Sequence, residues 1–280
     1  LKNIWTWVSG NCSIDALGIY GIKGIADANN APGNRWASIS WKDSSGNFWL
    51  FGGDSHTGWL NDLWKYDGAN WTWVSGSNTT DQPGIYGIKG VADANNIPKP
   101  REYSISWIDS NNTLWLFGGR WNDNLTGLKS LNDLWKYDGT NWTWVSGSNL
   151  TNQKGIYGTQ KVADVDNIPG ARWGSISWID SNGSFWLFGG FGYDNAGNYD
   201  SLNDLWKYDG ANWTWVSGGN TVYQWGIYGT KGVADSDNVP GSRYHSTSWN
   251  DSFGNFWLFG GYGYDYAGNN GNLNDLWKYD

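Results

Sequence analysis

The sequence predicts an all-β fold made of four copies of one supersecondary unit. The seven-residue motif Asn-Asp-Leu-Trp-Lys-Tyr-Asp occurs four times, at intervals of 71 residues. The copies start at Asn61, Asn132, Asn203 and Asn274. A fixed period of that length indicates stacked repeats that share a core. Short runs inside each copy alternate apolar and polar residues as strands do, and no window has helical spacing. Aromatic and β-branched residues fill those runs, which also favours strands.

The second copy shows the four strands that we expect in each unit. Residues 101–108 alternate small polar with large apolar side chains, and residues 113–117 form an apolar run that ends at Gly118-Gly119. Residues 133–137 make a third strand, and Asp138-Gly139 is a strong hairpin signal before a fourth strand at 142–145. The short connections predict one antiparallel sheet per copy.

A long connection rich in Gly, Asn, Asp and Pro precedes each first strand. Ordinary connections are much shorter, so this one is either ordered and functional or packed on a rim. Its sequence also repeats, because Gly-Ile-Tyr-Gly recurs at 18–21, 84–87, 155–158 and 226–229. This repetition favours an ordered segment.

The spacing of glycine, tyrosine and tryptophan in each copy resembles the kelch repeat. In that pattern a strand ending in Gly-Gly is followed by a variable loop, a Tyr and, after six more residues, a Trp. The matching sets are Gly52-Gly53 with Tyr66 and Trp73, Gly118-Gly119 with Tyr137 and Trp144, Gly189-Gly190 with Tyr208 and Trp215, and Gly260-Gly261 with Tyr279 and Trp7. The resemblance covers essentially the whole chain and implies a β-propeller. The long insertion before each first strand departs from the family pattern.

The two ends of the chain contribute to the predicted architecture. Residues 3–10 look like a fourth strand without its first three, and the chain ends at Asp280 after a third strand. The resemblance implies that the N-terminal strand pairs with Asn274–Asp280, which closes residues 1–280 into one domain with four blades of four antiparallel strands. A fragment of a longer array is the alternative, and the missing initiator Met suggests a mature or excised piece.

Tryptophan is unusually frequent, with 25 Trp and no Met in 280 residues. A ring of few blades leaves wide gaps between sheets, and large aromatic side chains fill such gaps. We therefore expect core packing rather than sugar stacking for the Trp residues of the outermost strands, at positions 5, 7, 71, 73, 142, 144, 213 and 215.

Charge and cysteine content exclude several functions. A net charge of −8 without basic clusters argues against nucleic acid or anionic lipid as a partner. No apolar run approaches the length of a membrane span, so we expect no membrane insertion. Cys12 is the only cysteine, so no intrachain disulfide can form. The Asn, Ser, Thr and Gly of the loops favour an extracellular or cell-surface protein.

Asn-x-Ser/Thr motifs near the outermost strands could carry glycans in such a location. The candidates are Asn11, Asn70, Asn78, Asn141, Asn149 and Asn212. The outermost strands read as exposed edges without Lys or Pro, and edges of this kind pair readily with other chains. Glycans at both ends of a strand would limit that pairing, whereas unmodified turn asparagines are the alternative.

The chain offers little catalytic or metal chemistry. His56 and His245 lie in different copies without partner cysteines, which makes a zinc or copper site unconvincing, and core packing is expected for His245. No nucleophile elbow occurs. We therefore predict no catalytic residues, no cofactor and no enzymatic activity.

Two repeated sets could nevertheless bind ions. Arg35, Arg101, Arg172 and Arg243 each begin an innermost strand, so they could ring a channel and attract an anion, although ion pairs with Asp62, Asp133, Asp204 and Asp275 are the favoured interpretation. Asp164, Asp166, Asp235 and Asp237 have the alternating spacing that calcium uses. Asx-turns explain that spacing equally well.

Variable loops on a rigid scaffold are where recognition usually lies. The loops after Gly-Gly are the most variable segments, at 54–60, 120–131, 191–202 and 262–273. Their candidate binding residues are Tyr193, Asp194, Tyr262, Tyr264 and Asp265. We predict a non-enzymatic structural or interaction module, with a building block of a surface layer or filament as its first form, in which the outer edge strands and the loops make the self-contacts. A lectin-like module that binds glycans or proteins is the alternative, and a carbohydrate-active enzyme is less favoured.

Overall fold

The computed structural model describes residues 4–123 and 127–280, and every regular element in these ranges is a β-strand. Asn3 of the predicted N-terminal strand and residues 124–126 of the variable loop 120–131 lie outside the described residues. No helix within the described ranges is long and apolar enough to cross a membrane.

The strands form four antiparallel sheets, one for each copy of the repeat. Sheet 1 consists of β1 (Ile39–Lys42), β2 (Phe48–Ser55), β3 (Gly58–Tyr66) and β4 (Trp71–Ser75), in that order. Sheet 2 consists of β5 (Ile105–Ile108), β6 (Leu114–Phe117), β9 (Leu134–Tyr137) and β10 (Trp142–Ser146), and β7 (Arg120–Asn122) pairs with β8 (Leu128–Ser130) in a separate hairpin. The four sheet strands lie in the predicted regions, but β5 begins at Ile105 and not at Arg101, and the predicted variable loop 120–131 contains the β7–β8 hairpin.

Sheets 3 and 4 extend the same plan. Sheet 3 consists of β12 (Ile176–Ile179), β13 (Phe185–Tyr193), β14 (Tyr199–Tyr208) and β15 (Trp213–Ser217), and β11 (Arg172–Trp173) also pairs with β13. Sheet 4 consists of β17 (Thr247–Asn250), β18 (Phe256–Tyr264) and β19 (Asn270–Tyr279), and β16 (Arg243–Tyr244) also pairs with β18. Among the residues that the structure describes, sheet 4 has no counterpart of β4, β10 and β15.

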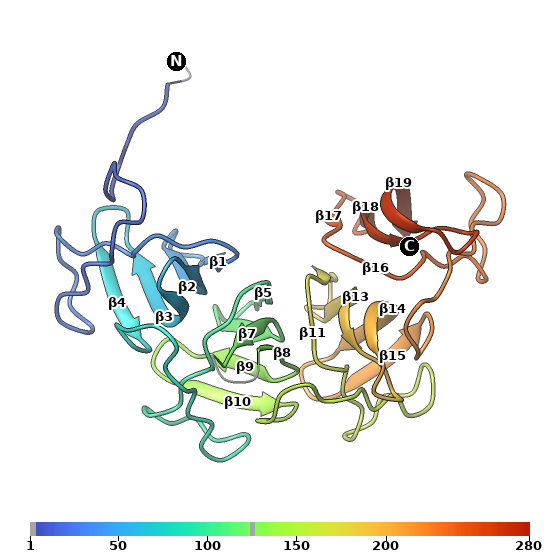
Figure 1. Cartoon of the computed structure of the whole chain (residues 1–280), viewed down its shortest axis with the longest axis horizontal. Coiled ribbons are helices and arrows are strands. Elements are labelled where there is room, and N and C mark those ends of the chain that lie inside the picture. The colour runs from blue at the N-terminus through green and yellow to red at the C-terminus, as the bar shows by residue number, and fades with distance from the viewer. Residues whose placement is uncertain (1–3, 124–126) are drawn as a thin grey trace.

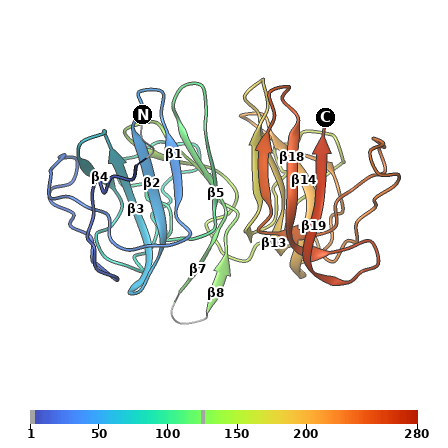
Figure 2. The ribbon, with the colours of Figure 1, turned by 90° about the horizontal axis from the view of Figure 1, so that it is seen from above.

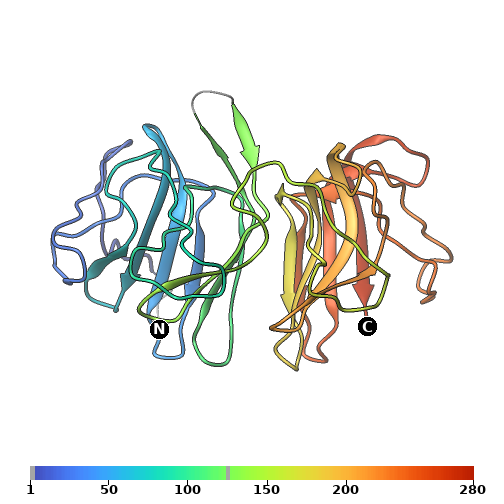
Figure 3. The same ribbon diagram turned by 90° about the horizontal axis from the view of Figure 1, so that it is seen from below.

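The four sheets follow one another along an arc, with β1, β5, β12 and β17 on the inside (Figure 1). These inner strands line a central hollow of about 510 Å³. The β7–β8 hairpin projects from one face of the arc, as both edge-on views show (Figures 2 and 3). The arrangement is that of a β-propeller with four blades, which confirms the predicted fold class.

Aromatic and aliphatic side chains fill each gap between neighbouring sheets. Phe51 packs on Trp142 between sheets 1 and 2, and Trp107 stacks on Phe185 between sheets 2 and 3, with ring centroids 3.6 Å apart. A third cluster joins sheets 3 and 4. The first Trp of β10 and of β15 is buried in these gaps, as expected of packing residues.

The predicted closure of the ring is wrong for the described residues. β19 pairs with β18 alone, and residues 4–9 belong to no strand. Trp5 is 102% exposed and Trp7 is 70% exposed. Figure 1 shows the N-terminal segment extending freely from sheet 1, with the N and C ends apart. The strand pattern specifies each sheet but not the angle between sheets, and here four sheets do not bring the two ends together.

The outermost strands are not the exposed edges that the sequence predicts, because the long connections cover them. The segment before sheet 1 runs along β4, where Gly24 N donates to Trp73 O at 2.8 Å and Asp27 forms a bridge with Trp71. Equivalent bonds cover β10 and β15. The connections are therefore ordered, and self-assembly through these outer edge strands is not supported because their outward carbonyl groups already accept hydrogen bonds.

Candidate functional site

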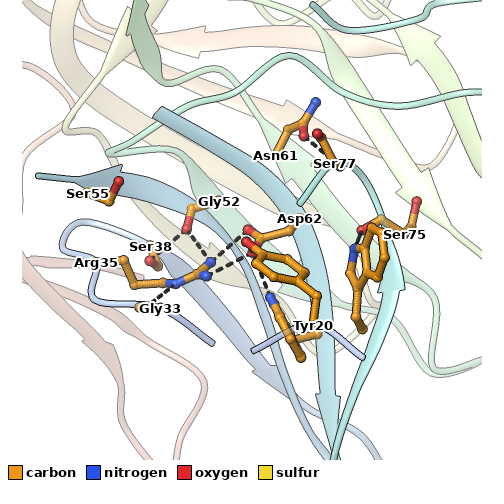
Figure 4. Close-up of polar contacts among 12 residues, drawn as sticks. Tyr20, Gly33, Arg35, Ser38, Gly52, Ser55, Asn61, Asp62, Ser75 and Ser77 are labelled. Carbon is orange, nitrogen blue, oxygen red and sulfur yellow. Dashed lines mark hydrogen bonds and ion pairs between the residues drawn. The ribbon is translucent and has the colours of Figure 1, made fainter. Parts of the chain in front are cut away.

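The repeated arginines sit in buried ion pairs within each sheet. In sheet 1 the Arg35 guanidinium donates to both carboxylate oxygens of Asp62, at 2.7 and 2.8 Å (Figure 4). Tyr20 from the long connection also donates to Asp62, at 2.7 Å, and so does the Trp64 indole, at 2.6 Å. The same cluster recurs as Arg101–Asp133, Arg172–Asp204 and Arg243–Asp275. It links the long connection and the segment that leads into the first strand to the third strand of the same repeat.

These clusters leave no arginine free to attract an anion. Each guanidinium is engaged by its carboxylate and by backbone carbonyls such as Gly33 O and Gly52 O. Burial tends to raise the pKa of Asp275, but hydrogen bonds and charge from Arg243, with donors from Tyr228 and Trp277, lower it to about 2. The aspartate therefore stays ionised and paired at neutral pH. The arginines have a structural role.

The rim of the central hollow is the place where the four copies differ most in chemistry. Two residues face each other at the rim of each sheet, one after the repeated Arg and one after Gly-Gly. The four pairs are Trp36 with Asp54, Glu102 with Arg120, Trp173 with Phe191, and Tyr244 with Tyr262. Backbone bonds link the rim from sheet to sheet, since Tyr103 N donates to Ala37 O, Gly174 N to Tyr103 O, and His245 N to Gly174 O.

The charged residues of the rim pairs are Asp54 on sheet 1 and Glu102 and Arg120 on sheet 2. The Arg120 guanidinium donates to Glu102 at 2.8 Å and lies over the Trp173 ring, 4.1 Å from its centroid. Burial raises the pKa of Glu102 despite this ion pair. His245 is exposed here beside Tyr103 and does not lie in the core, so its predicted packing role is wrong. The rim offers aromatic faces and one partly covered cation.

The two ends of the arc expose surfaces that are buried everywhere else in the molecule. On sheet 4, Leu276 is 55% exposed, whereas its counterparts Leu63, Leu134 and Leu205 are 0–5% exposed because the next sheet covers them. Phe259 and Trp249 are exposed in the same way. We call this surface, defined by Trp249, Phe259 and Leu276, the trailing face of sheet 4.

The opposite end has the complementary surface. Phe48 on sheet 1 is 50% exposed, whereas Phe185 at the equivalent position of sheet 3 is 1% exposed. Leu50, Tyr66 and Trp71 on the same side are partly exposed. We call this surface, defined by Phe48, Leu50, Tyr66 and Trp71, the leading face of sheet 1. Each interface between neighbouring sheets joins the trailing face of one sheet to the leading face of the next. The two exposed end faces are therefore of the two types that pack together inside the molecule.

Sheet 4 also has an open position beside β19. In sheet 3 the strand β15 lies between β14 and the connection, where Asp164 N, Lys161 N and Asn167 Nδ2 donate to its carbonyls. In sheet 4 the equivalent connection residues are Gly232, Asp235 and Asn238. Within the described residues Asn238 Nδ2 donates only to Val233 O, of its own connection. We call the space between β19 and residues 232–238 the open slot.

Asn274 in β19 faces the same junction. Its counterpart Asn203 is buried, accepts from Gly219 N after β15 at 3.0 Å and donates to Pro240 O before sheet 4 at 3.1 Å. The same two contacts occur at Asn61 and Asn132. Asn274 itself is exposed. Gly232, Asp235, Asn238 and Asn274 are thus the counterparts of groups that bond to a following strand and connection elsewhere in the chain.

Three of the five predicted loop residues lie in strands and not in loops: Tyr193 ends β13, and Tyr262 and Tyr264 belong to β18. Tyr262 belongs to the rim, whereas Tyr264 packs on Tyr223 and Tyr193 on Tyr199. Asp194 is buried and accepts from three backbone amides of its own turn. Asp265 accepts from Ala267 N and Asn269 N in a similar turn.

The calcium and glycan candidates lie at the surface. Asp164 accepts from Asp166 N, and Asp235 accepts from Asp237 N, which is Asx-turn geometry. No group of three or more His, Cys, Asp or Glu that could hold a metal occurs within residues 4–123 and 127–280. Asn11, Asn78 and Asn149 are exposed, and Asn70, Asn141 and Asn212 are partly exposed in the turns before the outer strands.

Several residues of the rim and of the end faces are absent from the sequence-based candidates. Trp36, Glu102, Trp173 and Tyr244 all follow the repeated Arg, and a different side chain at an otherwise constant position is the signal that points to them. The end faces carry no such signal, because Phe259 and Leu276 have the same identity as their buried counterparts.

The sheets and their arrangement define an all-β protein of the β-propeller type whose four blades form an open arc. No family model matches the chain, and no curated protein matches it. Among solved structures the chain is similar to YjhT, with 13% sequence identity and a TM-score of 0.47. That alignment covers 93% of this chain and 67% of YjhT. A likeness this distant carries no argument about function.

Proposed function

We propose that this chain is a non-enzymatic, kelch-like structural module that assembles end to end through its two end faces. The observation that supports the proposal is the exposure of Leu276 beside its three buried counterparts. Fully burying a side chain of this kind stabilises a protein by about 1.5–3 kcal/mol. Trp249, Phe259 and Leu276 together therefore provide a large driving force for association.

Assembly should be measurable by sedimentation equilibrium over a range of protein concentrations. The average mass of the wild-type protein should rise above the 31.3 kDa of one chain as concentration increases. Leu276→Lys places a charge on the trailing face and should hold the protein at the mass of one chain. Val165→Lys changes an apolar residue on a connection that is even more exposed than Leu276, and this variant should behave as the wild type does. A wild-type protein that stays at the mass of one chain at every soluble concentration contradicts the proposal.

The rim supports a second candidate, recognition of a glycan or of a protein segment. Its four residue pairs differ between the copies, although most other positions repeat. It also has aromatic rings, Tyr103 and Trp173, in contact with Arg120. Aromatic rings at interfaces supply large contact areas at a low entropy cost. Trp173→Ala should abolish signals on a glycan array, while Trp225→Ala, an exposed Trp away from the rim pairs, should keep them. An array without hits for the wild type argues against a glycan ligand.

An extracellular location remains part of this proposal. It rests on the loop composition and on the exposure of Asn11, Asn78 and Asn149. The long connections already cover the outer strands, so glycans are not needed to protect those edges. Intact-mass measurement on native material should show masses above that of the polypeptide, and a bare polypeptide mass would contradict glycosylation.

A further inference from the structure

We infer that the partner at the end of the arc is a second copy of this chain, and that its N-terminal strand enters the open slot of sheet 4. The inference rests on the proposed assembly and specifies how the two copies join. The strand is Trp5–Ser9, with the sequence Trp-Thr-Trp-Val-Ser, identical to β4, β10 and β15. The slot thus carries the counterparts of the polar groups that bind this same sequence in sheet 3.

The identity of the donor follows from what the chain leaves exposed. Residues 4–9 lie outside every sheet, and the Trp5 side chain has no protection from water. The slot of sheet 4 lies at the other end of the arc (Figure 1). The strand and the slot are therefore separated within one molecule, although they are complementary. A second copy brings them together without any change in the arc.

The register of the joint is set by the third sheet. Within sheet 3, Trp206 lies opposite Trp215, Lys207 opposite Thr214, and Tyr208 opposite Trp213. The same register places Trp277 opposite Trp7 of the incoming strand, Lys278 opposite Thr6, and Tyr279 opposite Trp5. On the other side of the strand, the amides of Gly232 and Asp235 and the side-chain amide of Asn238 would donate to Trp7 O and Trp5 O. These are the bonds that Lys161, Asp164 and Asn167 make to β15.

The chain that follows the strand reaches the correct place in the second copy. After β15 the chain runs through a connection into sheet 4, whose leading face covers sheet 3. After residue 9 the second copy runs through an equivalent connection into its own sheet 1, whose leading face is open. Strand transfer and face-to-face packing are therefore parts of one joint, equivalent to the joint between sheets 3 and 4.

Asn274 links the two parts of the joint. By equivalence with Asn203, its side-chain oxygen would accept from Asn11 N, and its amide would donate to Pro32 O, both in the second copy. Neither bond exists within a single copy, since Asn274 is exposed. Asn274→Ala should therefore leave the single chain as stable as the wild type and weaken association by about tenfold or more, as the loss of two hydrogen bonds requires.

The joint is heterologous, because different surfaces of the two copies meet. Such a contact builds a closed ring when its rotation closes and an open filament when it does not. The structure specifies the joint, and electron microscopy of the assembled protein distinguishes these two products.

Disulfide trapping between two different variants tests the strand transfer. Both variants carry Cys12→Ser, which removes the one exposed native thiol. One also carries Thr6→Cys and the other Lys278→Cys, and mild oxidation of the mixture should yield a cross-linked pair of chains. Lys207→Cys with Thr214→Cys in one chain is the positive control, because these residues lie opposite each other in sheet 3. Lys65→Cys mixed with Thr6→Cys is the negative control, because β4 already occupies that position.

The outcomes separate this inference from the proposed function. A Thr6–Lys278 cross-link between chains, with the controls as stated, supports strand transfer. Association by sedimentation without this cross-link overturns strand transfer and leaves end-to-end assembly standing. A third variant carries Thr6→Cys and Lys278→Cys in one chain. If its disulfide forms only within that chain, at the mass of one chain, the ring closes internally, and both strand transfer and end-to-end assembly are overturned. An absence of association overturns both as well.

Discussion

At the scale of single residues, the repeated Arg–Asp ion pairs can be compared with one another, because their partners are equivalent and they differ in how far water reaches them. Arg172 and Asp204 are almost completely buried, whereas the Asp275 side chain at the open end is 15% exposed. Replacing one member of a buried pair leaves an uncompensated charge, which costs about 3–5 kcal/mol. The cost should be lower where water can reach the charge that remains.

We therefore expect Asp204→Asn to lower the free energy of unfolding by about 3–5 kcal/mol and Asp275→Asn by less, in dilute protein. Asp237→Asn, at an exposed turn, is the control and should have almost no effect. Urea denaturation followed by tryptophan fluorescence measures all three. Equal losses for Asp204→Asn and Asp275→Asn would mean that water access at the open end does not weaken the ion pair.

Ion pairs between residues that recur in every copy could be predicted from the sequence, whereas ion pairs between residues that vary could not. Arg35 and Asp62 recur together in every copy, so their ion pair was open to prediction. The Arg120–Glu102 pair has no counterpart in the other copies, and its position on the rim appears only when the strands are placed. The position of His245 at the rim, beside Tyr103, likewise appears only when the sheets are placed.

At the scale of elements, the turns around the outermost strand depend on glycine in two different ways. Gly139, before β10, has φ +97, and an added Cβ would meet no neighbouring atom. Gly147, after β10, has φ +78, and an added Cβ would overlap the carbonyl oxygen of Asn132. The first position requires only a left-handed backbone, whereas the second also requires the absence of a side chain.

We expect Gly139→Ala to destabilise the protein by about 1–2 kcal/mol, the cost of a left-handed conformation. Gly147→Ala should cost more, because β10 and β9 must also separate to admit the methyl group. Thermal unfolding followed by circular dichroism compares the two variants directly. A larger loss for Gly139→Ala would show that the close approach at Asn132 does not constrain the turn.

The sequence Trp-Thr-Trp-Val-Ser shows how far local pattern determines an element. It forms β4, β10 and β15, and the same five residues at 5–9 form no strand. The three strands each lie between a partner strand and a connection that hydrogen-bonds to their outer side. The alternation of residues predicts which segments can form a strand. The adjacent strand and connection decide whether the segment is paired in the structure.

At the scale of the whole molecule, the open arc creates a gradient of stability. Sheets 2 and 3 are covered on both faces, whereas sheets 1 and 4 each have one uncovered face. In repeat architectures stability is approximately the sum of each unit and its contacts with neighbours. The terminal sheets should therefore open at a lower free energy than the central ones.

Hydrogen exchange of the dilute protein, measured by mass spectrometry, should show this gradient. We expect amides of β6 and β13 to exchange more slowly than those of β2 and β18, which have nearly the same sequences. Residues 5–9 should exchange as an unstructured peptide does. Uniform protection of all four sheets would indicate that the ends of the arc are covered in the single chain.

The number of sheets and the general form of each were predictable, but the open arc was not. Period, turn residues and strand alternation determine a repeat, and the four repeats are almost the same. The relative rotation of neighbouring sheets depends on how side chains such as Trp107 and Phe185 interdigitate across the gap. Small differences in that rotation add up over four sheets, so the position of one end relative to the other follows only from the assembled structure.

Each connection covers the outer strand of its own repeat, so a connection and its four strands make one self-contained unit. In sheet 4 the connection and β19 are not joined by a fourth strand within the described residues, and residues 5–9 carry the sequence of that strand. A variant in which residues 1–10 are placed directly after Asp280 would join that sequence to β19 as β15 is joined to β14. Sheet 4 would then be completed within one polypeptide, and we expect this variant to need no second copy.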